Sequence, residues 1–153
     1  MGKIYTLFLS FTMVLYANFA SAQDYSKYSK EALEKILEDI AIVETKVLMP
    51  MRDGVGLSSD IYRPKDAEGD LPTIFVRTPY NMNPPGIRTL RNIVEAVSRG
   101  YAYILQNERG RYFSEGKFEI LGYPRTDGYD ALDWISSQNW SNNKVGTIGC
   151  SST

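Results

Sequence analysis

The last residues of the chain, KVGTIGCSST, bring a serine directly after an apolar run. Ser151 stands two residues after Gly149, and a strand that turns sharply into a helix holds a serine in a strained conformation only when its neighbours are this small. The hydroxyl of such a serine points outward, where it can attack a carbonyl carbon. The general pattern asks for a second glycine two residues after the serine, where this chain has Thr153.

Two other interpretations of this ending stay open. Ser151 could cap the helix that follows the strand, which is a commoner role for serine than catalysis. Cys150 is a second nucleophile by its chemistry, but the bulky Ile148 stands two residues before it, and a buried structural role fits this cysteine better. Because the chain has one cysteine and no histidine, it can form neither an internal disulfide nor a histidine-bearing zinc site.

The absence of histidine bears on any chemistry at Ser151. A serine hydroxyl is a weak nucleophile until a base takes its proton, and the usual base is a histidine oriented by a carboxylate. Where a serine lies on such a turn from strand to helix, both partners follow it along the chain. We therefore expect them after residue 153. We expect the chain alone to have negligible activity of this kind and poor stability, because a parallel sheet without its later strands exposes an apolar edge.

Composition and charge exclude several classes of protein. The 153 residues are 43% hydrophobic and 23% charged, as in an ordinary globular domain. A formal net charge of -1 provides no basic surface for nucleic acid, so we expect no nucleic-acid partner. The sequence gives no indication of the oligomeric state.

Residues 1–22 have the composition of a secretory signal peptide. Lys3 precedes an apolar stretch from Ile4 to Tyr16, and Ala20 and Ala22 form an Ala-x-Ala cleavage site that would leave Gln23 as the mature N-terminus. The stretch is shorter than the roughly 20 apolar residues of a spanning helix, so we expect no stable membrane anchor. The protein is expected to be exported, to the periplasm or the extracellular space.

Beyond the signal peptide, the pattern predicts a helical segment over 23–42 and then a hairpin. Ser29 can cap a helix whose apolar stripe is Leu33, Ile36, Leu37 and Ile40. In the next stretch apolar residues alternate on both sides of Asp53-Gly54, which predicts two antiparallel strands joined by a tight primed turn with positive φ at Gly54.

From residue 71 onward, short apolar runs alternate with helical stripes. Ile74–Val76, YAYILQ and KVGTIG predict strands that are buried on both faces. Gly100 can end a helix built on Leu90, Ile93, Val94 and Val97. Thr126 or Asp127 can cap a second helix, with Ala131, Leu132, Trp134 and Ile135 as its buried side. The fold class is therefore α/β, with a mostly parallel sheet and an antiparallel hairpin at its start.

Four segments in this order resemble the X-Pro dipeptidyl-peptidase and cocaine esterase-like (CocE/NonD) serine hydrolases, a group that includes α-amino-acid ester hydrolases and glutaryl acylases. The segments are MPMRDGVGLSSDIYRP, PTIFVRTPYN, GYAYILQNERGRYFSEGKFEI and TDGYDALDWISSQNWSNNKVGTIGCSS. The resemblance covers about Val47 to Thr153. It implies that residues 43–153 are the N-terminal part of an α/β-hydrolase catalytic domain, an incomplete fold truncated at the turn that carries the nucleophile.

The resemblance also implies roles for three residues. Ser151 matches the nucleophile of the family, and Tyr80 matches the tyrosine whose hydroxyl donates to the oxyanion. Ser152 matches the residue whose backbone N–H is the second donor, although the family commonly has tyrosine there. In the family the second glycine comes one residue later than in the general pattern, just beyond Thr153. Asn107 is a departure, since relatives often have aspartate there, and we expect a neutral hydrogen bond to replace an ion pair with a neighbouring arginine.

Other polar and aromatic residues of these segments fit structural roles. We expect Arg109 and the loop of Ser114, Glu115 and Gly116 to support the site. Tyr112 and Phe113 are expected to be packing residues. Asp127, Asp130 and Asp133 recur at helical spacing, and favourable charge at a helix N-terminus explains them more simply than a metal site.

The function that the resemblance implies is a serine hydrolase that cleaves an ester or a peptide bond of a small substrate through an acyl-enzyme, as X-Pro dipeptidyl-peptidases and acyl esterases do. This chemistry needs no cofactor and no metal. The alternative is a catalytically inactive fragment or a non-catalytic homologue that binds a ligand.

Overall fold

The computed structural model describes residues 23–67, 69–120 and 124–149, with only the backbone of residues 124 and 125. The predicted signal peptide (1–22), the predicted site residues Ser151 and Ser152, and Cys150 lie outside the described residues. The elements follow in the order η1 (Tyr25–Lys27), α1 (Lys30–Ile40), β1 (Ala41–Pro50), β2 (Gly56–Pro64), β3 (Leu71–Thr78), α2 (Ile87–Ser98), β4 (Ala102–Asn107), α3 (Pro124–Ser136) and β5 (Ser141–Thr147).

The strands form one mixed sheet in the order β1-β2-β4-β3-β5. β2 is antiparallel to both β1 and β4, whereas β3 is parallel to both β4 and β5. Within the described residues the sheet therefore has two antiparallel and two parallel pairings, so the expectation of a mostly parallel sheet was wrong. The reason is that the hairpin strands β1 and β2 belong to the same sheet as β3, β4 and β5, because β2 pairs antiparallel with β4.

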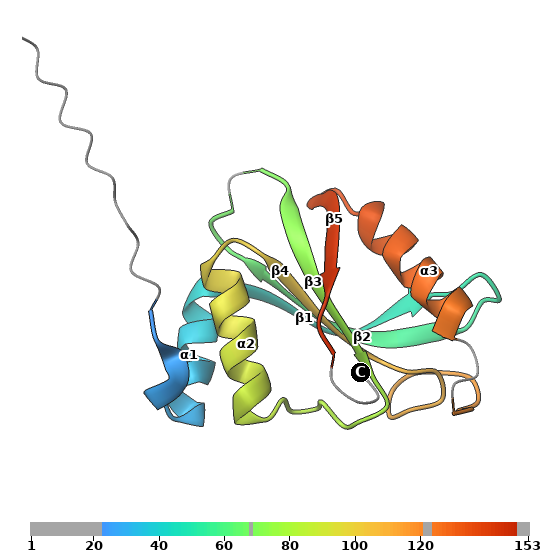
Figure 1. Ribbon diagram of the computed structural model, residues 1–153, viewed down its shortest axis with the longest axis horizontal. Coiled ribbons are helices and arrows are strands. Elements are labelled where there is room, and N and C mark those ends of the chain that lie inside the picture. The colour runs from blue at the N-terminus through green and yellow to red at the C-terminus, as the bar shows by residue number, and fades with distance from the viewer. Residues whose placement is uncertain (1–22, 68, 121–123, 150–153) are drawn as a thin grey trace, which may run out of the picture.

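Helices cover both faces of this sheet (Figure 1). α1 and α2 pack on one face, where Leu33 and Ile93 join a core with the sheet residue Tyr103. α3 packs on the other face, where Ala131 and Ile135 meet Phe75 and Ile104. Neighbouring residues of β3 and β4 thus point into different cores, which confirms that these two strands are buried on both faces.

The first two helices form as their stripes predict. Ser29 Oγ accepts the Ala32 N–H at 3.3 Å and caps α1, whose Leu33 and Leu37 are buried. α2 buries all four predicted residues and is ended by Gly100, whose φ of 80° is left-handed. The helical segment ends at Ile40, two residues before the predicted limit of residue 42, because β1 begins at Ala41.

α3 begins earlier than predicted. Pro124 opens it, since the missing N–H of a proline costs nothing in a first turn, so Thr126 and Asp127 lie inside the helix rather than capping it. Ala131 and Ile135 are fully buried and Trp134 is partly buried, but Leu132 is 38% exposed and faces away from the sheet.

The hairpin is confirmed, but its turn differs from the predicted one. The Met51 N–H donates to Val55 O and the Gly54 N–H donates to Met51 O, which is a three-residue loop with left-handed Gly54 (φ 83°). Arg52 and Asp53 are not left-handed, so this is not a primed two-residue turn.

Of the three strands that were predicted to be buried on both faces, β5 is the one that is not. Among the described strands it borders only β3, and Gly146, Thr147 and Ile148 are exposed. The apolar run KVGTIG therefore predicted the strand correctly but its burial wrongly.

Candidate active site

Tyr80 lies just beyond the carboxyl end of β3, with Pro79 between it and Thr78. Its side chain is 50% exposed, and its backbone N–H donates to Thr78 Oγ1 at 3.2 Å. Within the described part of the chain, no hydrogen bond involves the phenol hydroxyl. No group among the described residues therefore occupies this hydroxyl.

The chain that leads to Ser151 reaches the same edge of the sheet. β5 is parallel to β3, with Phe75 opposite Thr147, and the Ile148 N–H donates to Phe75 O at 3.4 Å. Because the carboxyl ends of adjacent parallel strands lie at one edge, Tyr80 and Gly149 follow strands that end side by side (Figure 1). Ser151 and Ser152 themselves lie outside the described residues.

The segment that carries Tyr80 is held by the chain just after β4. The carbonyl of Thr78 accepts the Glu108 N–H at 3.0 Å, and the carbonyl of Pro79 accepts Arg111 Nε at 2.9 Å. Asn107 Nδ2 donates to Tyr80 O at 2.9 Å and to Thr78 O at 3.4 Å. The expected bond between Asn107 and an arginine is therefore wrong: this amide donates to backbone carbonyls, a role that a carboxylate cannot fill.

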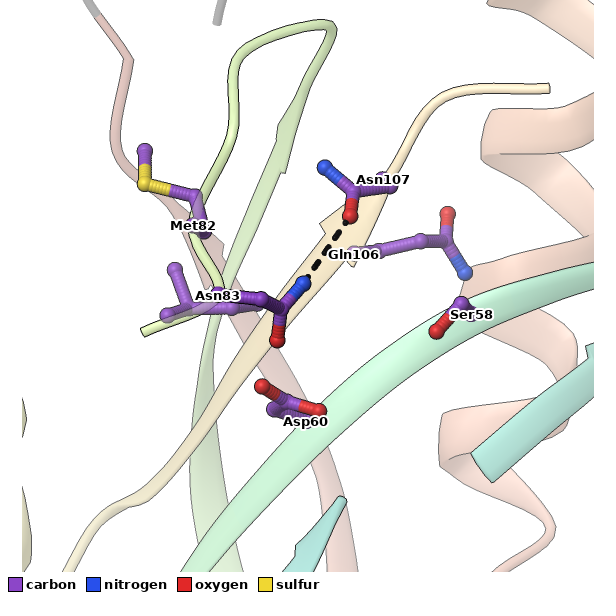
Figure 2. A pocket seen from close by; sticks show the side chains of 7 residues that line it. Ser58, Asp60, Met82, Asn83, Gln106 and Asn107 are labelled. Atoms are coloured by element: carbon purple, nitrogen blue, oxygen red, sulfur yellow. Dashed lines mark hydrogen bonds between the residues drawn. The ribbon is translucent and has the colours of Figure 1, made fainter. Parts of the chain in front are cut away.

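Asn107 also lines a narrow polar pocket on the α1/α2 face of the sheet. Figure 2 shows Asn83 Nδ2 donating to Asn107 Oδ1, at 3.4 Å, above the carboxylate of Asp60. The remaining lining residues are Ser58, Met82, Leu105 and Gln106. The pocket is too narrow to hold even a water molecule, so it serves packing rather than ligand binding.

Asp60 was not singled out from the sequence. It is 5% exposed in β2, and burial raises the pKa of its carboxyl group. Its Oδ1 accepts the Lys46 N–H at 2.8 Å, where β1 is interrupted by a register shift and Lys46 has a left-handed φ of 55°. An aspartate in an alternating strand normally faces solvent, and the sequence carries no signal that β2 is covered on both faces.

Arg109 connects the loop after β4 to the β1–β2 hairpin turn and to α3. Its guanidinium donates to Asp127 of α3 at 2.7 and 3.1 Å and to Asp53 of the hairpin turn at 2.8 and 3.2 Å. The hydrogen bonds from Arg109 hold the pKa of Asp53 below its usual value. The predicted supporting role of Arg109 is confirmed, whereas no local pattern of the sequence indicates its two partners.

The loop of Ser114, Glu115 and Gly116 fastens the same region to β2. Ser114 Oγ accepts the Ser58 N–H and donates to Asn107 O, both at 2.8 Å, while Glu115 Oε2 accepts the Gly56 N–H at 2.8 Å. Gly116 has a φ of 81°, and a Cβ there would lie 2.9 Å from Arg109 Cγ. These three residues are structural supports, as predicted.

Two aromatic residues, Tyr112 and Phe113, directly precede this loop. The expectation that they are packing residues is wrong. Tyr112 and Phe113 are each 49% exposed. Lys46 Nζ lies 4.2 Å from the ring centroid of Phe113, and the guanidinium of Arg111 lies 5.3 Å from that of Tyr112. Both rings therefore lie at the surface and contact cationic side chains instead of the core.

Two of the three aspartates of α3, Asp127 and Asp130, pair with arginines. Asp127 lies in the first turn, as the charge argument expects, but Arg109 is its partner. Asp130 is paired with Arg52, whose hydrogen bonds lower the pKa of the Asp130 carboxyl. Within residues 23–67, 69–120 and 124–149, no group of three or more metal-ligating side chains comes together, and no helix has the length and apolar character to cross a membrane.

Comparison with known proteins places these features in a family. Cocaine esterase from Rhodococcus sp. (strain MB1 Bresler) is 40% identical over 111 residues, which are 71% of this chain and 19% of that protein. An α-amino acid ester hydrolase structure is 32% identical with a TM-score of 0.59, covering 71% of this chain and 21% of the other. The chain thus spans about a fifth of the length of these relatives.

A CocE/NonD family hydrolase from Staphylococcus aureus has the same fold, with a TM-score of 0.62 and 24% identity over 71% of this chain and 23% of its own. The family described as X-Pro dipeptidyl-peptidase (S15 family) matches residues 53–153, from the hairpin turn through Tyr80 to the serine that follows β5. The chain belongs to this S15 family of hydrolases, and its described residues have the family's α/β fold with a mixed sheet.

Proposed function

We propose that Ser151 is the nucleophile of an exported serine hydrolase that cleaves an ester or a peptide bond through an acyl-enzyme. The observation that carries this proposal is the parallel pairing of β3 and β5, since it brings Tyr80 and the chain entering Ser151 to one edge of the sheet. Membership of a hydrolase family supports it.

The mechanism follows from the donors that this edge offers. Ser151 Oγ attacks the substrate carbonyl carbon while its proton passes to a histidine from beyond residue 153. The carbonyl oxygen becomes an oxyanion, which accepts hydrogen bonds from the Tyr80 hydroxyl and the Ser152 backbone N–H. The intermediate collapses, the histidine returns the proton to the departing alcohol or amine, and water then hydrolyses the acyl-enzyme.

The substrate class is a small acyl ester or a short peptide. The names of the relatives support these two bond types. They are a cocaine esterase, an α-amino acid ester hydrolase and the X-Pro dipeptidyl-peptidase family. No metal or organic cofactor takes part in the steps above. The leader over residues 1–22 directs the protein to the periplasm or the extracellular space.

A fluorophosphonate probe tests the nucleophile. We would express the longest open reading frame that contains this chain, react it with the probe, and locate the label by peptide mass spectrometry. The wild type and Cys150→Ser should carry one label on Ser151, and Ser151→Ala should carry none. A folded wild-type sample without label, or a Ser151→Ala variant that keeps it, would contradict the proposal.

Ser152, which stands where the family commonly has tyrosine, motivates one other candidate, a catalytically inactive product or a non-catalytic homologue that binds an acyl or peptide ligand. Sequencing the gene beyond codon 153 distinguishes the two. A continuing frame with an aspartate and a histidine at family spacing supports catalysis, whereas a stop codon supports the inactive form.

A further inference from the structure

We propose that Asn107 and Arg111 are positioning residues for the Tyr80 phenol, an inference that rests on the proposed function. Asn107 is buried, and both side chains donate to backbone carbonyls rather than to the phenol itself. Both side chains donate hydrogen bonds to the backbone that carries Tyr80. The acceptors are the consecutive carbonyl groups of Thr78, Pro79 and Tyr80.

All three of these carbonyls accept hydrogen bonds from the segment 107–111. The donors are the backbone N–H of Glu108, the Arg111 Nε and the Asn107 Nδ2. Beyond Thr78 the chain leaves β3, and no strand pairing fixes its backbone. The backbone sets the direction of the Cα–Cβ bond, so these bonds fix the point from which the Tyr80 side chain reaches its hydroxyl position. A misplacement of about 1 Å in such a group can cost about 10²-fold in rate.

The carboxamide of Asn107 suits this position better than a carboxylate. The residue is 3% exposed, its Nδ2 faces the carbonyl oxygens of Tyr80 and Thr78, and its Oδ1 accepts from Asn83 Nδ2. An ionised aspartate would place negative charge against two carbonyl oxygens without a proton to donate. The amide at residue 107 is thus matched to the two carbonyl groups that it faces.

Arg111 is itself held in place. Its guanidinium lies 5.3 Å from the Tyr112 ring centroid and 4.8 Å from the Phe118 ring centroid, while its Nε donates to Pro79 O. Two aromatic contacts restrict the long side chain, so its bond to Pro79 is maintained at a low entropic cost.

A double-mutant cycle on the full-length enzyme tests this inference, with kcat and KM measured on a p-nitrophenyl acyl ester. Tyr80→Phe removes the phenol donor and should lower kcat about 10²- to 10³-fold. Asn107→Ala and Arg111→Met should each lower kcat about tenfold or more and leave KM nearly unchanged. In the Tyr80→Phe background the same changes should cost almost nothing, because a phenol that is absent cannot be misplaced.

Asn107→Asp adds a pH signature. Its kcat should fall as pH rises through the pKa of the new buried carboxyl group, because only the protonated acid can donate to a carbonyl. Asn142→Asp is the matched control. The Asn142 Oδ1 accepts the Lys144 N–H, and a carboxylate accepts it equally well, so the pH profile of this variant should follow that of the wild type.

Three results would overturn the inference: wild-type kcat in Asn107→Ala and Arg111→Met, losses that multiply fully with that of Tyr80→Phe, or a wild-type pH profile in Asn107→Asp. If Asn107→Ala does not fold, the Arg111→Met cycle decides alone, since that side chain is partly exposed. A folded wild type that neither hydrolyses the ester nor reacts with a fluorophosphonate would instead reject the proposed function, and this inference with it.

Discussion

Tyr80 is the residue on which the proposed chemistry can be examined most directly. Its ring is half exposed, and its hydroxyl makes no hydrogen bond within the described residues, so removing that oxygen disturbs no packing. Asp60 differs from Tyr80, since its side chain is buried and its carboxylate accepts a backbone hydrogen bond. We therefore expect substitution of Tyr80 to change activity and substitution of Asp60 to change stability.

Tyr80→Phe should lower kcat by about 10²- to 10³-fold, equivalent to about 2.7–4 kcal/mol of transition-state stabilisation, because one of two oxyanion donors is lost. Thermal unfolding should show an unchanged midpoint, because no contact is removed. Tyr101→Phe, at another exposed tyrosine, should keep both values. An active Tyr80→Phe enzyme with the wild-type kcat would exclude the phenol from the mechanism.

Asp60→Asn should stabilise the fold at neutral pH, because it removes a buried charge while its amide oxygen still accepts the Lys46 N–H. Burial raises the folded-state pKa of Asp60 above the unfolded value, so the ionised carboxylate lowers wild-type stability at pH above both. As pH falls through the folded pKa, the wild type gains stability and the advantage of the variant disappears. Urea unfolding of both proteins between pH 3 and about 8 measures this.

Asp60→Leu separates charge from hydrogen bonding, since it leaves the Lys46 N–H without an acceptor. We expect it to be less stable than Asp60→Asn by about 1–3 kcal/mol. Asp66→Asn, at an exposed aspartate, is the control and should have no effect. An Asp60→Asn protein that is less stable than the wild type at pH 7 would show that the carboxylate is required in its charged form.

At the scale of elements, two arginines fasten the β1–β2 hairpin turn to α3. Arg109 joins Asp53 to Asp127, and Arg52 donates to both carboxylate oxygens of Asp130. The two connections differ in burial: the side chains of Arg109 and Asp127 are 9% and 6% exposed, whereas that of Arg52 is 56% exposed. Coulomb attraction is strong where water is excluded, so the inner pair should dominate the connection.

Arg109→Met should cost about 3–5 kcal/mol of unfolding free energy, because it leaves the Asp127 carboxylate buried without its principal partner. Arg52→Met is the matched control and should cost at most about 1 kcal/mol, as for other exposed ion pairs. Chemical denaturation of the full-length protein measures both values. Equal losses in the two variants would mean that burial does not separate the pairs.

The whole molecule shows what its sequence could predict. The stripes of α1 and α2 and the two-sided burial of β3 and β4 are local patterns, so residues such as Leu33, Ile93 and Ile104 were placed correctly. The exposure of β5 and the partners of Asn107 depend on which strands and loops meet across the chain. No local pattern contains that information, and the family resemblance supplied Tyr80 without its supporting contacts.

Export is a property of the whole protein that remains a prediction from residues 1–22. Expressed with its leader in a bacterium, the mature protein should begin at Gln23, which intact-mass measurement would show. Ala22→Arg should block cleavage, because the site requires small residues, whereas Asn18→Gln should not. Retention of the uncleaved leader by the wild type would contradict this prediction.

The central claim is that the Tyr80 phenol and the Ser151 hydroxyl serve one reacting carbonyl. A crystal structure of the full-length protein with a bound fluorophosphonate tests it directly, because the phosphonyl oxygen occupies the position of the oxyanion. We predict phosphorus bonded to Ser151 Oγ and the Tyr80 hydroxyl about 2.7–3.1 Å from the phosphonyl oxygen. An adduct on another residue, or a Tyr80 hydroxyl on the opposite rim of the sheet, would contradict the account.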